Sequence, residues 1–304
     1  SIGGATVASG YITPGITSNP ANLAAMRFAY MQLNFSNNHF NSSSSDISSS
    51  GFNGIDIVQP IPVYRGSLVF NLGGYKSIDF MSASKDDDYE YSEQGKINTY
   101  HIGAAVEFAR RLYLGFDFKL YKGKDEMMEK GQSMTHYYEP KFSGTSMTIG
   151  MMHVITKNLQ YGISIDMPSY LTVDDHYSEI NNMDDSESWS GAWDYKADKP
   201  MTLHAGGALL TKMFNLFYEI EYTNWSNLEF SSDYFSMFDI IDINNEIKND
   251  FSHTVSHHIG GAMRAPIFPV HLFAGYQFLP TPFKNQYDNN IRECYSFGFS
   301  IALK

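Results

Sequence analysis

The chain has 304 residues, an aromatic content of 15% and a formal net charge of −12. This charge disfavours nucleic acid as a partner, because phosphate binding needs clustered Lys and Arg, and the single cysteine, Cys294, excludes an internal disulfide and any multi-thiolate metal site. No stretch approaches the ~20 apolar residues of a membrane-spanning helix, so a helical membrane protein is excluded.

The first part of the chain is rich in small side chains and lacks the alternation of a strand. Asn19 is a suitable helix cap and Pro20 suits the first helical position, so a short helical turn is predicted over residues 20–26. In a membrane barrel, a segment that contributes no strand must lie in the periplasm or fold into the lumen, and its Gly and Ala residues allow close packing against the wall. We therefore expect residues 1–27 to form a plug and residues 28–304 to form a β-barrel.

From residue 112 to 121 apolar and polar side chains alternate: Phe116 and Phe118 share one face, whereas Asp117 and Lys119 occupy the other. Side chains of a strand point alternately to its two faces, so the pattern indicates a strand with one apolar and one charged side. In total, about twelve such strands have the length needed to cross a bilayer at a tilt. The others lie at 29–35, 54–60, 67–80, 100–108, 145–151, 159–167, 201–210, 216–223, 255–263, 270–278 and 295–303.

The connections between these segments alternate in length. Short links are expected at 61–66, 109–111, 156–158, 211–213 and 265–269, and long polar loops at 41–53, 83–96, 122–138, 169–191, 227–251 and 279–291. Outer-membrane barrels combine short periplasmic turns with long external loops.

A soluble sandwich or barrel would also alternate, but its apolar face would point inward. Here the opposite face carries Asp117, Asp166 and Glu219 among other ionic side chains, which are too many charges for a dry core. The sequence therefore predicts an all-β fold, a transmembrane antiparallel β-barrel surrounded by the lipid of a Gram-negative-type outer membrane. Phe116, Ile163 and Phe299 should then face outward, whereas Asp117 and Glu219 should face the interior.

Several short stretches carry a family resemblance. They are Gly3-Gly4-Ala5-x-Val7-Ala8, Asn19-Pro20-Ala21-x-Leu23-Ala24, Gln59-Pro60-Ile61-Pro62 with Gly66-Ser67-Leu68-Val69, the run 260–264, Phe273-Ala274-Gly275-Tyr276 and Pro280-Thr281-Pro282. Together they resemble the long-chain fatty acid transporter family (FadL-like), which includes aromatic-hydrocarbon channels and related barrel proteins of the type-nine secretion machinery.

The resemblance implies an N-terminal hatch around Asn19, Pro20, Ala21 and Leu23, and a barrel of fourteen strands. The sequence departs from the family in two respects. It predicts about twelve strands, and it ends in Ala-Leu-Lys instead of a terminal aromatic residue. Either a hairpin is missing or this is a smaller variant of the fold.

Inward positions of the predicted strands include residue types used in acid–base catalysis. No nucleophile elbow or phosphate-binding glycine loop accompanies them, so we expect a network that pairs charges and anchors the plug, without enzymatic activity or a cofactor. The expected lumen-lining residues are His101, Glu107, Asp117, Lys119, His204, Glu219, Glu221, His258 and Arg264.

Two clusters invite a metal interpretation. His253 and His257 share a strand face that His258 does not, and no close carboxylate or Cys completes a ligand set. The acidic stretch 174–187 lacks the Gly and the spacing of a calcium loop. We therefore expect no metal site, and a solvated acidic external loop is the default interpretation of this stretch.

The leading functional hypothesis, by analogy to the family, is passive uptake of hydrophobic small molecules that are fatty-acid-like or aromatic. The ligand would enter the barrel from outside, the hatch would shift, and the ligand would leave through a gap in the wall, with Gly73 and Gly74 as the expected kink. The alternative is a structural or interaction platform whose acidic external loops bind another protein, as in a secretion accessory. Paired glycines can also merely ease packing, and the fold by itself does not decide between the functions.

Overall fold

The structure is a computed structural model that describes residues 2–10, 18–41, 46–85, 88–183, 188–233, 237–264, 270–284 and 291–301. The order of its elements is η2 (Pro20–Ala25), β1 (Tyr30–Asn41), β2 (Asp46–Ile61), β3 (Leu68–Lys85), β4 (Tyr89–Ala109), β5 (Leu112–Gly131), β6 (Met134–Tyr138), β7 (Lys141–Val154), β8 (Leu159–Asp166), β9 (Ser169–Asn181), β10 (Ser188–Lys199), β11 (Thr202–Leu210), β12 (Phe214–Asn224), η3 (Trp225–Asn227), β13 (Glu229–Ser231), α1 (Met237–Asp250), β14 (His253–Arg264), β15 (Val270–Leu279) and β16 (Arg292–Ile301). No helix in these ranges is long and apolar enough to cross a membrane.

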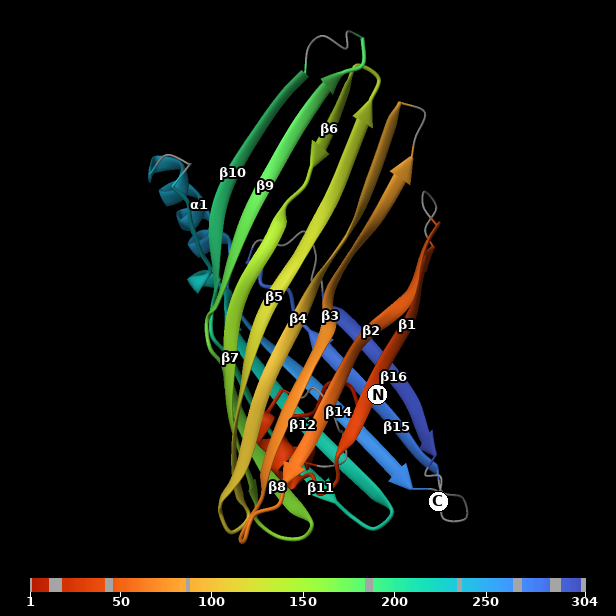
Figure 1. Cartoon of the computed structure of the whole chain (residues 1–304), viewed down its shortest axis with the longest axis vertical. Coiled ribbons are helices and arrows are strands. Elements are labelled where there is room, and N and C mark those ends of the chain that lie inside the picture. Colours follow the sequence, from red (N-terminus) through yellow and green to blue (C-terminus); the bar gives the residue numbers. More distant parts are fainter. Residues whose placement is uncertain are drawn as a thin grey trace.

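All strands belong to one antiparallel sheet of sixteen strands that curls around a common axis (Figure 1). Its order is β1-β2-β3-β4-β5-β6-β9-β7-β8-β11-β12-β14-β15-β16, with β10 attached to β9 and β13 attached to β10. Among the described residues no ladder joins β1 to β16. The predicted all-β, antiparallel barrel fold is confirmed.

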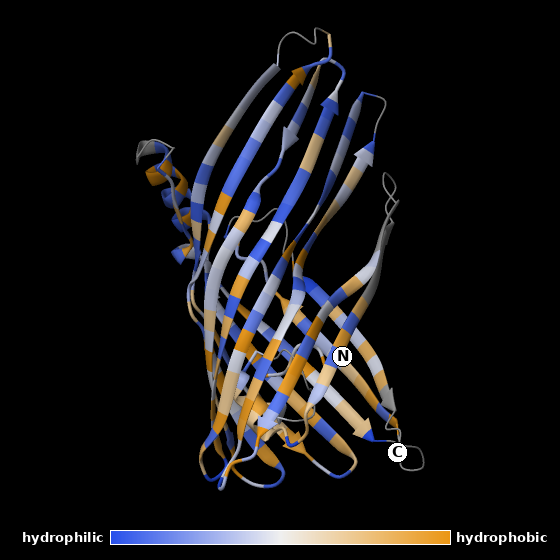
Figure 2. Cartoon of the chain, in the orientation of Figure 1, coloured by the Kyte–Doolittle hydropathy of each residue, from blue (hydrophilic) through white to orange (hydrophobic). Residues whose placement is uncertain are grey.

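Each of the twelve predicted strands corresponds to an observed strand. The prediction of long loops was wrong for most of 41–53, 83–96, 122–138 and 169–191, because β1 to β6, β9 and β10 run through them. Residues 227–251 likewise contain β13 and α1. The strands continue beyond the apolar region with polar side chains on both faces, so the ladder persists while the alternation in hydropathy that predicts it disappears. Figure 2 shows this change as a mainly hydrophilic upper part.

Short links join the strands at the lower end of the barrel in Figure 1, which we call the turn end. They lie between β2 and β3, β4 and β5, β7 and β8, and β11 and β12, as predicted. Gly66 and Arg111 adopt the left-handed backbone conformation there, with φ of +76° and +66°. The predicted link 265–269 lies outside the described residues.

The two faces of the sheet separate apolar from ionic side chains in the predicted sense. Phe116, Ile163 and Phe299 are 47%, 43% and 71% exposed, whereas Asp117 and Glu219 are 8% and 1% exposed. A soluble barrel would show the opposite distribution, because exposed charges cost nothing in water and buried apolar side chains form its core. The outward face is therefore suited to hydrocarbon, and the interior is polar.

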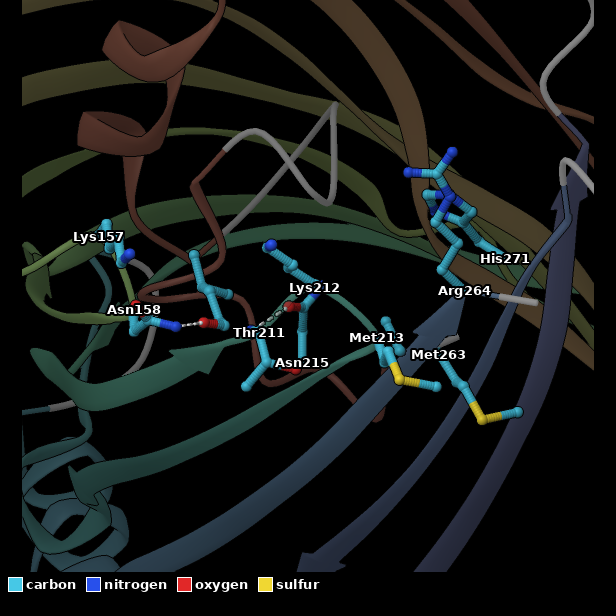
Figure 3. Close-up of a pocket in the computed structure, with 11 residues that line it drawn as sticks. Lys157, Asn158, Thr211, Lys212, Met213, Asn215, Met263, Arg264 and His271 are labelled. Carbon is cyan, nitrogen blue, oxygen red and sulfur yellow. Dashed lines mark hydrogen bonds between the residues drawn. The ribbon is translucent and has the colours of Figure 1, made fainter. Parts of the chain in front are cut away.

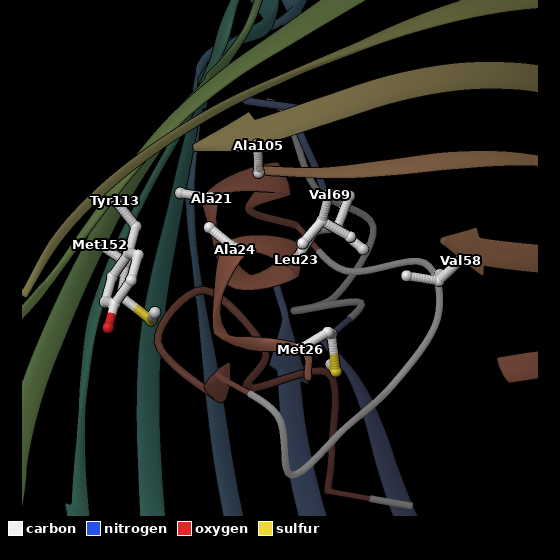
Figure 4. Close-up of a cluster of buried hydrophobic side chains, with 9 residues drawn as sticks. All are labelled: Ala21, Leu23, Ala24, Met26, Val58, Val69, Ala105, Tyr113 and Met152. Carbon is white, nitrogen blue, oxygen red and sulfur yellow. The ribbon is translucent and has the colours of Figure 1, made fainter. Parts of the chain in front are cut away.

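The N-terminal segment, defined as residues 2–10 and 18–26, packs against the inner side of the sheet. Its helical turn η2 begins at Pro20, and the Asn19 side chain caps it by accepting a hydrogen bond from Ala21 N at 3.0 Å, as the sequence predicts. Two buried clusters hold the segment in place. One joins η2 to the wall through Ala21, Leu23, Ala24, Met26, Val58, Val69, Ala105, Tyr113 and Met152 (Figure 4), and the other consists of Ile2, Ala5, Val7, Ala8, Ala208, Phe217 and Ala262.

Candidate functional site: the polar interior and the N-terminal segment

A first ionic cluster lies on the inner face of the four neighbouring strands β2, β3, β4 and β5. His101 Nδ1 lies 3.1 Å from Asp117 Oδ1 and 3.1 Å from the Asn71 amide nitrogen, while His101 Nε2 lies 3.8 Å from Asp56 Oδ1. All four side chains are buried. Gly73 makes room for this histidine, because a Cβ at that position would stand 2.5 Å from His101 Nε2.

A second ionic cluster continues around the interior from β5 to β14. Lys119 Nζ donates to Thr148 Oγ1 at 2.9 Å and lies 3.7 Å from Asp166 Oδ1. His204 connects Asp166 to β12, with Nε2 3.5 Å from Asp166 Oδ2 and Nδ1 2.9 Å from Glu219 Oε1. Acidic and basic groups thus alternate along the cluster, which offsets the cost of removing them from water.

Glu221 and His258 complete this second cluster on β12 and β14. Glu221 Oε2 lies 3.9 Å from His204 Nδ1 and 3.6 Å from His258 Nε2. His258 Nδ1 in turn lies 3.1 Å from the carbonyl oxygen of Gly3. The interior network therefore reaches the N-terminal segment directly.

Further side chains of the wall bind the backbone of the N-terminal segment. Glu219 Oε2 accepts hydrogen bonds from Thr6 N at 2.7 Å and Val7 N at 2.8 Å. Gln160 donates to Ala8 O at 2.6 Å, and Asn19 donates to Met151 O of the wall at 2.9 Å. The segment is consequently attached through its own main chain at Thr6, Val7 and Ala8, and through the Asn19 side chain to the main chain of the wall.

The structure brings seven of the nine predicted lumen-lining residues into these two clusters. Glu107 and Arg264 lie apart from them at the turn end: Glu107 accepts a hydrogen bond from Arg111 N at 3.1 Å, and Arg264 is exposed. Asp56 and Asn71 belong to the first cluster and were not among the predicted site residues. Their signal was present in the sequence, because each is a polar side chain inside an otherwise apolar strand.

Cavities lie at the turn end, one of them beside the N-terminal segment. One of about 710 Å³ has Met26, Tyr113, Met152, Val154 and Leu210 among its apolar lining residues, and Arg27 and Lys157 carry its positive charges. A second of about 560 Å³ is lined by Lys157, Lys212, Arg264 and His271 together with polar and Met side chains (Figure 3). Both volumes are within the range of small-molecule pockets.

The wall divides between β2 and β3. The two strands pair from Ile61 with Leu68 up to Gly54 with Tyr75, and beyond this point β2 pairs only with β1, and β3 only with β4, among the described residues. Both strands carry a bulge at the division, with Asn53 and Ser77 as the extra residues. Gly73 and Gly74 themselves stay in register with both neighbours. Figure 1 shows the upper parts of β2 and β3 diverging.

The structure separates the residues of the two clusters that invited a metal interpretation, the histidines at 253, 257 and 258 and the acidic stretch 174–187. His257 faces outward, with Nδ1 2.8 Å from the Tyr218 hydroxyl, whereas His258 faces inward. Most of the acidic stretch forms β9, and residues 184–187 lie outside the described residues. In the part of the chain that the structure describes, no group of three or more His, Cys, Asp or Glu side chains is arranged to hold a metal ion.

An apolar outward face, an ionic interior and a main-chain-bound N-terminal segment define a membrane β-barrel of the outer-membrane type. Neither a protein-family model nor a curated protein sequence matches the chain. Its structure is similar to the Pseudomonas putida toluene transporter TodX, with a TM-score of 0.63 and 12% identity over 99% of this chain and 88% of that one. It is also similar to a Pseudomonas aeruginosa FadL homologue, with a TM-score of 0.69 and 10% identity over 100% and 84% of the two chains.

A third similar structure, the Ralstonia pickettii toluene transporter TbuX, has a TM-score of 0.63 and 10% identity over 94% of this chain and 84% of that one. At identities this low, the structural similarity shows a shared fold, and the roles of individual residues cannot be transferred to this chain. The resemblance to FadL-like proteins is thereby confirmed at the level of the fold.

Proposed function

We propose that this protein is a passive outer-membrane channel for hydrophobic small molecules, in which the N-terminal segment acts as a hatch. The observation that carries the proposal is the combination of a FadL-like fold with an N-terminal segment bound inside the wall through Glu219, Gln160 and Asn19. The similar structures are described as toluene transporters and a monoaromatic hydrocarbon channel, which supports a hydrophobic cargo.

In the proposed mechanism, ligand moves from the outside into the barrel and leaves sideways between β2 and β3. The two bulges at Asn53 and Ser77 support this route, because a bulge bends its strand and ends regular pairing. A lateral exit would deliver an apolar molecule into the bilayer without passage through water, which is the direction favoured by the hydrophobic effect. No chemical step is needed, so we propose no enzymatic role.

Deletion of Ser77 tests this mechanism. Without the extra residue, β3 should run straight and pair further with β2, which closes the division in the wall. Uptake of toluene and of a long-chain fatty acid into proteoliposomes should then fall by at least about tenfold, which corresponds to a barrier to passage that is higher by ~1.4 kcal/mol. The matched control is deletion of Phe108, the extra residue of a bulge at the turn end of β4. Equal uptake in the Ser77 deletion and the parent protein would refute the lateral route, and no uptake by the folded parent would refute the channel.

The alternative function, a platform that binds another protein through acidic external loops, stays a prediction. Its acidic stretch lies largely on β9, a paired strand within the sheet. A protein partner would be supported by loss of a stable complex when the carboxylates exposed on this strand, such as Asp174, are neutralised.

A further inference from the structure

The strands extend well beyond the apolar part of the barrel. On β5 the outward side chains Phe116, Phe118 and Leu120 are followed by Lys122 and Lys124. A row of lysines is not accommodated in hydrocarbon, so the strands beyond this level stand outside the bilayer. We call this region the external extension; it comprises residues 88–98, 122–131, 134–138, 172–181 and 188–197.

One face of the external extension continues the inner face of the barrel. Side chains alternate along a strand, so Asp125 and Glu129 lie on the same side of β5 as the buried Asp117. Exposure follows this alternation on β10, where Trp193 and Tyr195 are half-buried and the residues between and beside them are exposed. We call this side the inner face of the extension.

Four aromatic rings meet on this inner face. The ring of Tyr177 on β9 lies 5.0 Å from that of Tyr138 on β6, and 5.3 Å and 6.1 Å from those of Trp189 and Trp193 on β10, measured between centroids. Trp189 is 58% exposed, and the other three are half-buried. These four residues form the aromatic cluster, whose ring surfaces are only partly covered by the protein.

Carboxylates surround the aromatic cluster. The Tyr177 hydroxyl donates to Glu179 Oε2 at 2.5 Å, Glu129 is the cross-strand neighbour of His136, and Asp175 is that of Trp193. Asp175 Oδ1 is shielded from solvent and has no hydrogen-bond partner among the described residues. Burial and the neighbouring Glu179 carboxylate raise the pKa of Tyr177 to about 12, as expected in a negative environment.

The lysines of the extension all lie on the other face. The inner face carries one basic ring, His136, whose Nδ1 lies 2.7 Å from the Tyr177 hydroxyl and 3.5 Å from Glu179 Oε2. The lysines at positions 96, 122, 124, 130 and 196 occupy the positions of their strands that alternate to the outward face, and the described ranges of the extension contain no arginine. The inner face instead carries the carboxylates of Glu93, Asp125, Glu129, Asp175 and Glu179. The aromatic cluster therefore combines exposed ring faces with a net negative charge.

We infer that the aromatic cluster binds organic cations with an apolar body, such as quaternary ammonium compounds. A cation is attracted by the negative faces of aromatic rings, and Trp and Tyr are the rings used for such ligands. The carboxylates of Glu129, Asp175 and Glu179 add attraction for the same charge and repel an anion. The inference rests on the proposed channel function and narrows its substrate class to hydrophobic molecules with a positive charge.

A pair of isosteric probes isolates the charge. Phenyltrimethylammonium and tert-butylbenzene have the same shape and differ in one positive charge, and benzenesulfonate supplies the anion. The chain has three tryptophans, so a Trp225→Phe background leaves only Trp189 and Trp193 as fluorescent reporters inside the cluster. We expect phenyltrimethylammonium to bind about tenfold more tightly than tert-butylbenzene, with no binding of benzenesulfonate and with weaker cation binding at high salt.

Two matched carboxylate variants test the location of the site. Glu179→Gln, or Glu129→Gln where the first folds poorly, should weaken binding of the cation several-fold and leave tert-butylbenzene unaffected. Glu126→Gln removes the same charge from the outward face of β5 and should change neither. Equal affinities for cation and isostere, or equal effects of the inner and outer variants, would overturn the inference. Toluene uptake measured in parallel separates the two proposals: uptake without charge preference refutes only the cation site, whereas absence of uptake refutes the channel.

Discussion

Replacing Glu219 with glutamine is expected to loosen the N-terminal segment. The Glu219 carboxylate is 1% exposed, and its Oε2 accepts both Thr6 N and Val7 N, at 2.7 Å and 2.8 Å. Its other oxygen faces His204 Nδ1 at 2.9 Å. Glutamine has nearly the same shape but carries a single neutral oxygen, so it can satisfy the two amides only as an uncharged acceptor and must turn its NH₂ group towards the histidine.

The magnitude follows from the difference between charged and neutral hydrogen bonds. A hydrogen bond to a charged group contributes about 1.5–3 kcal/mol, and a neutral one about 0.5–1.5 kcal/mol. The substitution should therefore cost about 1–1.5 kcal/mol for each amide, or about 2–3 kcal/mol for the pair. Local opening of residues 2–10 should become about 30- to 150-fold more frequent.

Amide hydrogen exchange of the peptide that contains Thr6 and Val7 measures this opening directly. Glu221→Gln is the control, because Glu221 contacts His204 and His258 but accepts no hydrogen bond from the described residues of the segment. Exchange at Thr6 and Val7 that is unchanged in Glu219→Gln, or equally accelerated in both variants, would refute the assignment of Glu219 as the anchor of the segment.

Three further outcomes are expected. Phe116→Arg, in the middle of the outward apolar row of β5, should destabilise the barrel folded in lipid by about 2–4 kcal/mol, measured from urea unfolding in vesicles. Gly150→Ala should lower the free energy of unfolding by about 1–3 kcal/mol, because the new Cβ would stand 2.0 Å from Asn19 Oδ1. Gly261→Ala is the control and should be tolerated, because the nearest atoms to its Cβ lie at 4.0 Å. The urea midpoints of unfolding of the two variants measure the difference. Burial and the Glu93 carboxylate raise the pKa of Asp125 from 3.8 to about 6. The folded state therefore holds the Asp125 proton more tightly than the unfolded state does. The resulting stabilisation is present below pH 4 and is lost as the pH rises through 6. Asp125→Asn should abolish that part of the pH dependence, and a difference between variant and parent that does not change between pH 4 and pH 7 would contradict it.

The sequence by itself determined the barrel and the direction of its faces. Within the apolar region, lipid on one side and polar groups on the other impose a period of two, and Phe116 beside Asp117 shows it within two residues. The cap at Asn19 and the turn at Pro20 were also predictable, because they depend only on neighbouring residues.

Only the tertiary structure decided which wall residues hold the N-terminal segment and which strands meet in the external extension. The contact of Glu219 with Thr6 and Val7 joins residues more than 200 positions apart, and no local pattern specifies which strand faces which part of the N-terminal segment. The strands of the external extension escaped prediction because their outward face lacks the apolar row that marks the strands of the apolar region, although the hydrogen-bonded ladder continues. Tyr138, Tyr177 and Trp189 meet there because strand pairing aligns three separate segments, and strand pairing is a property of the folded sheet.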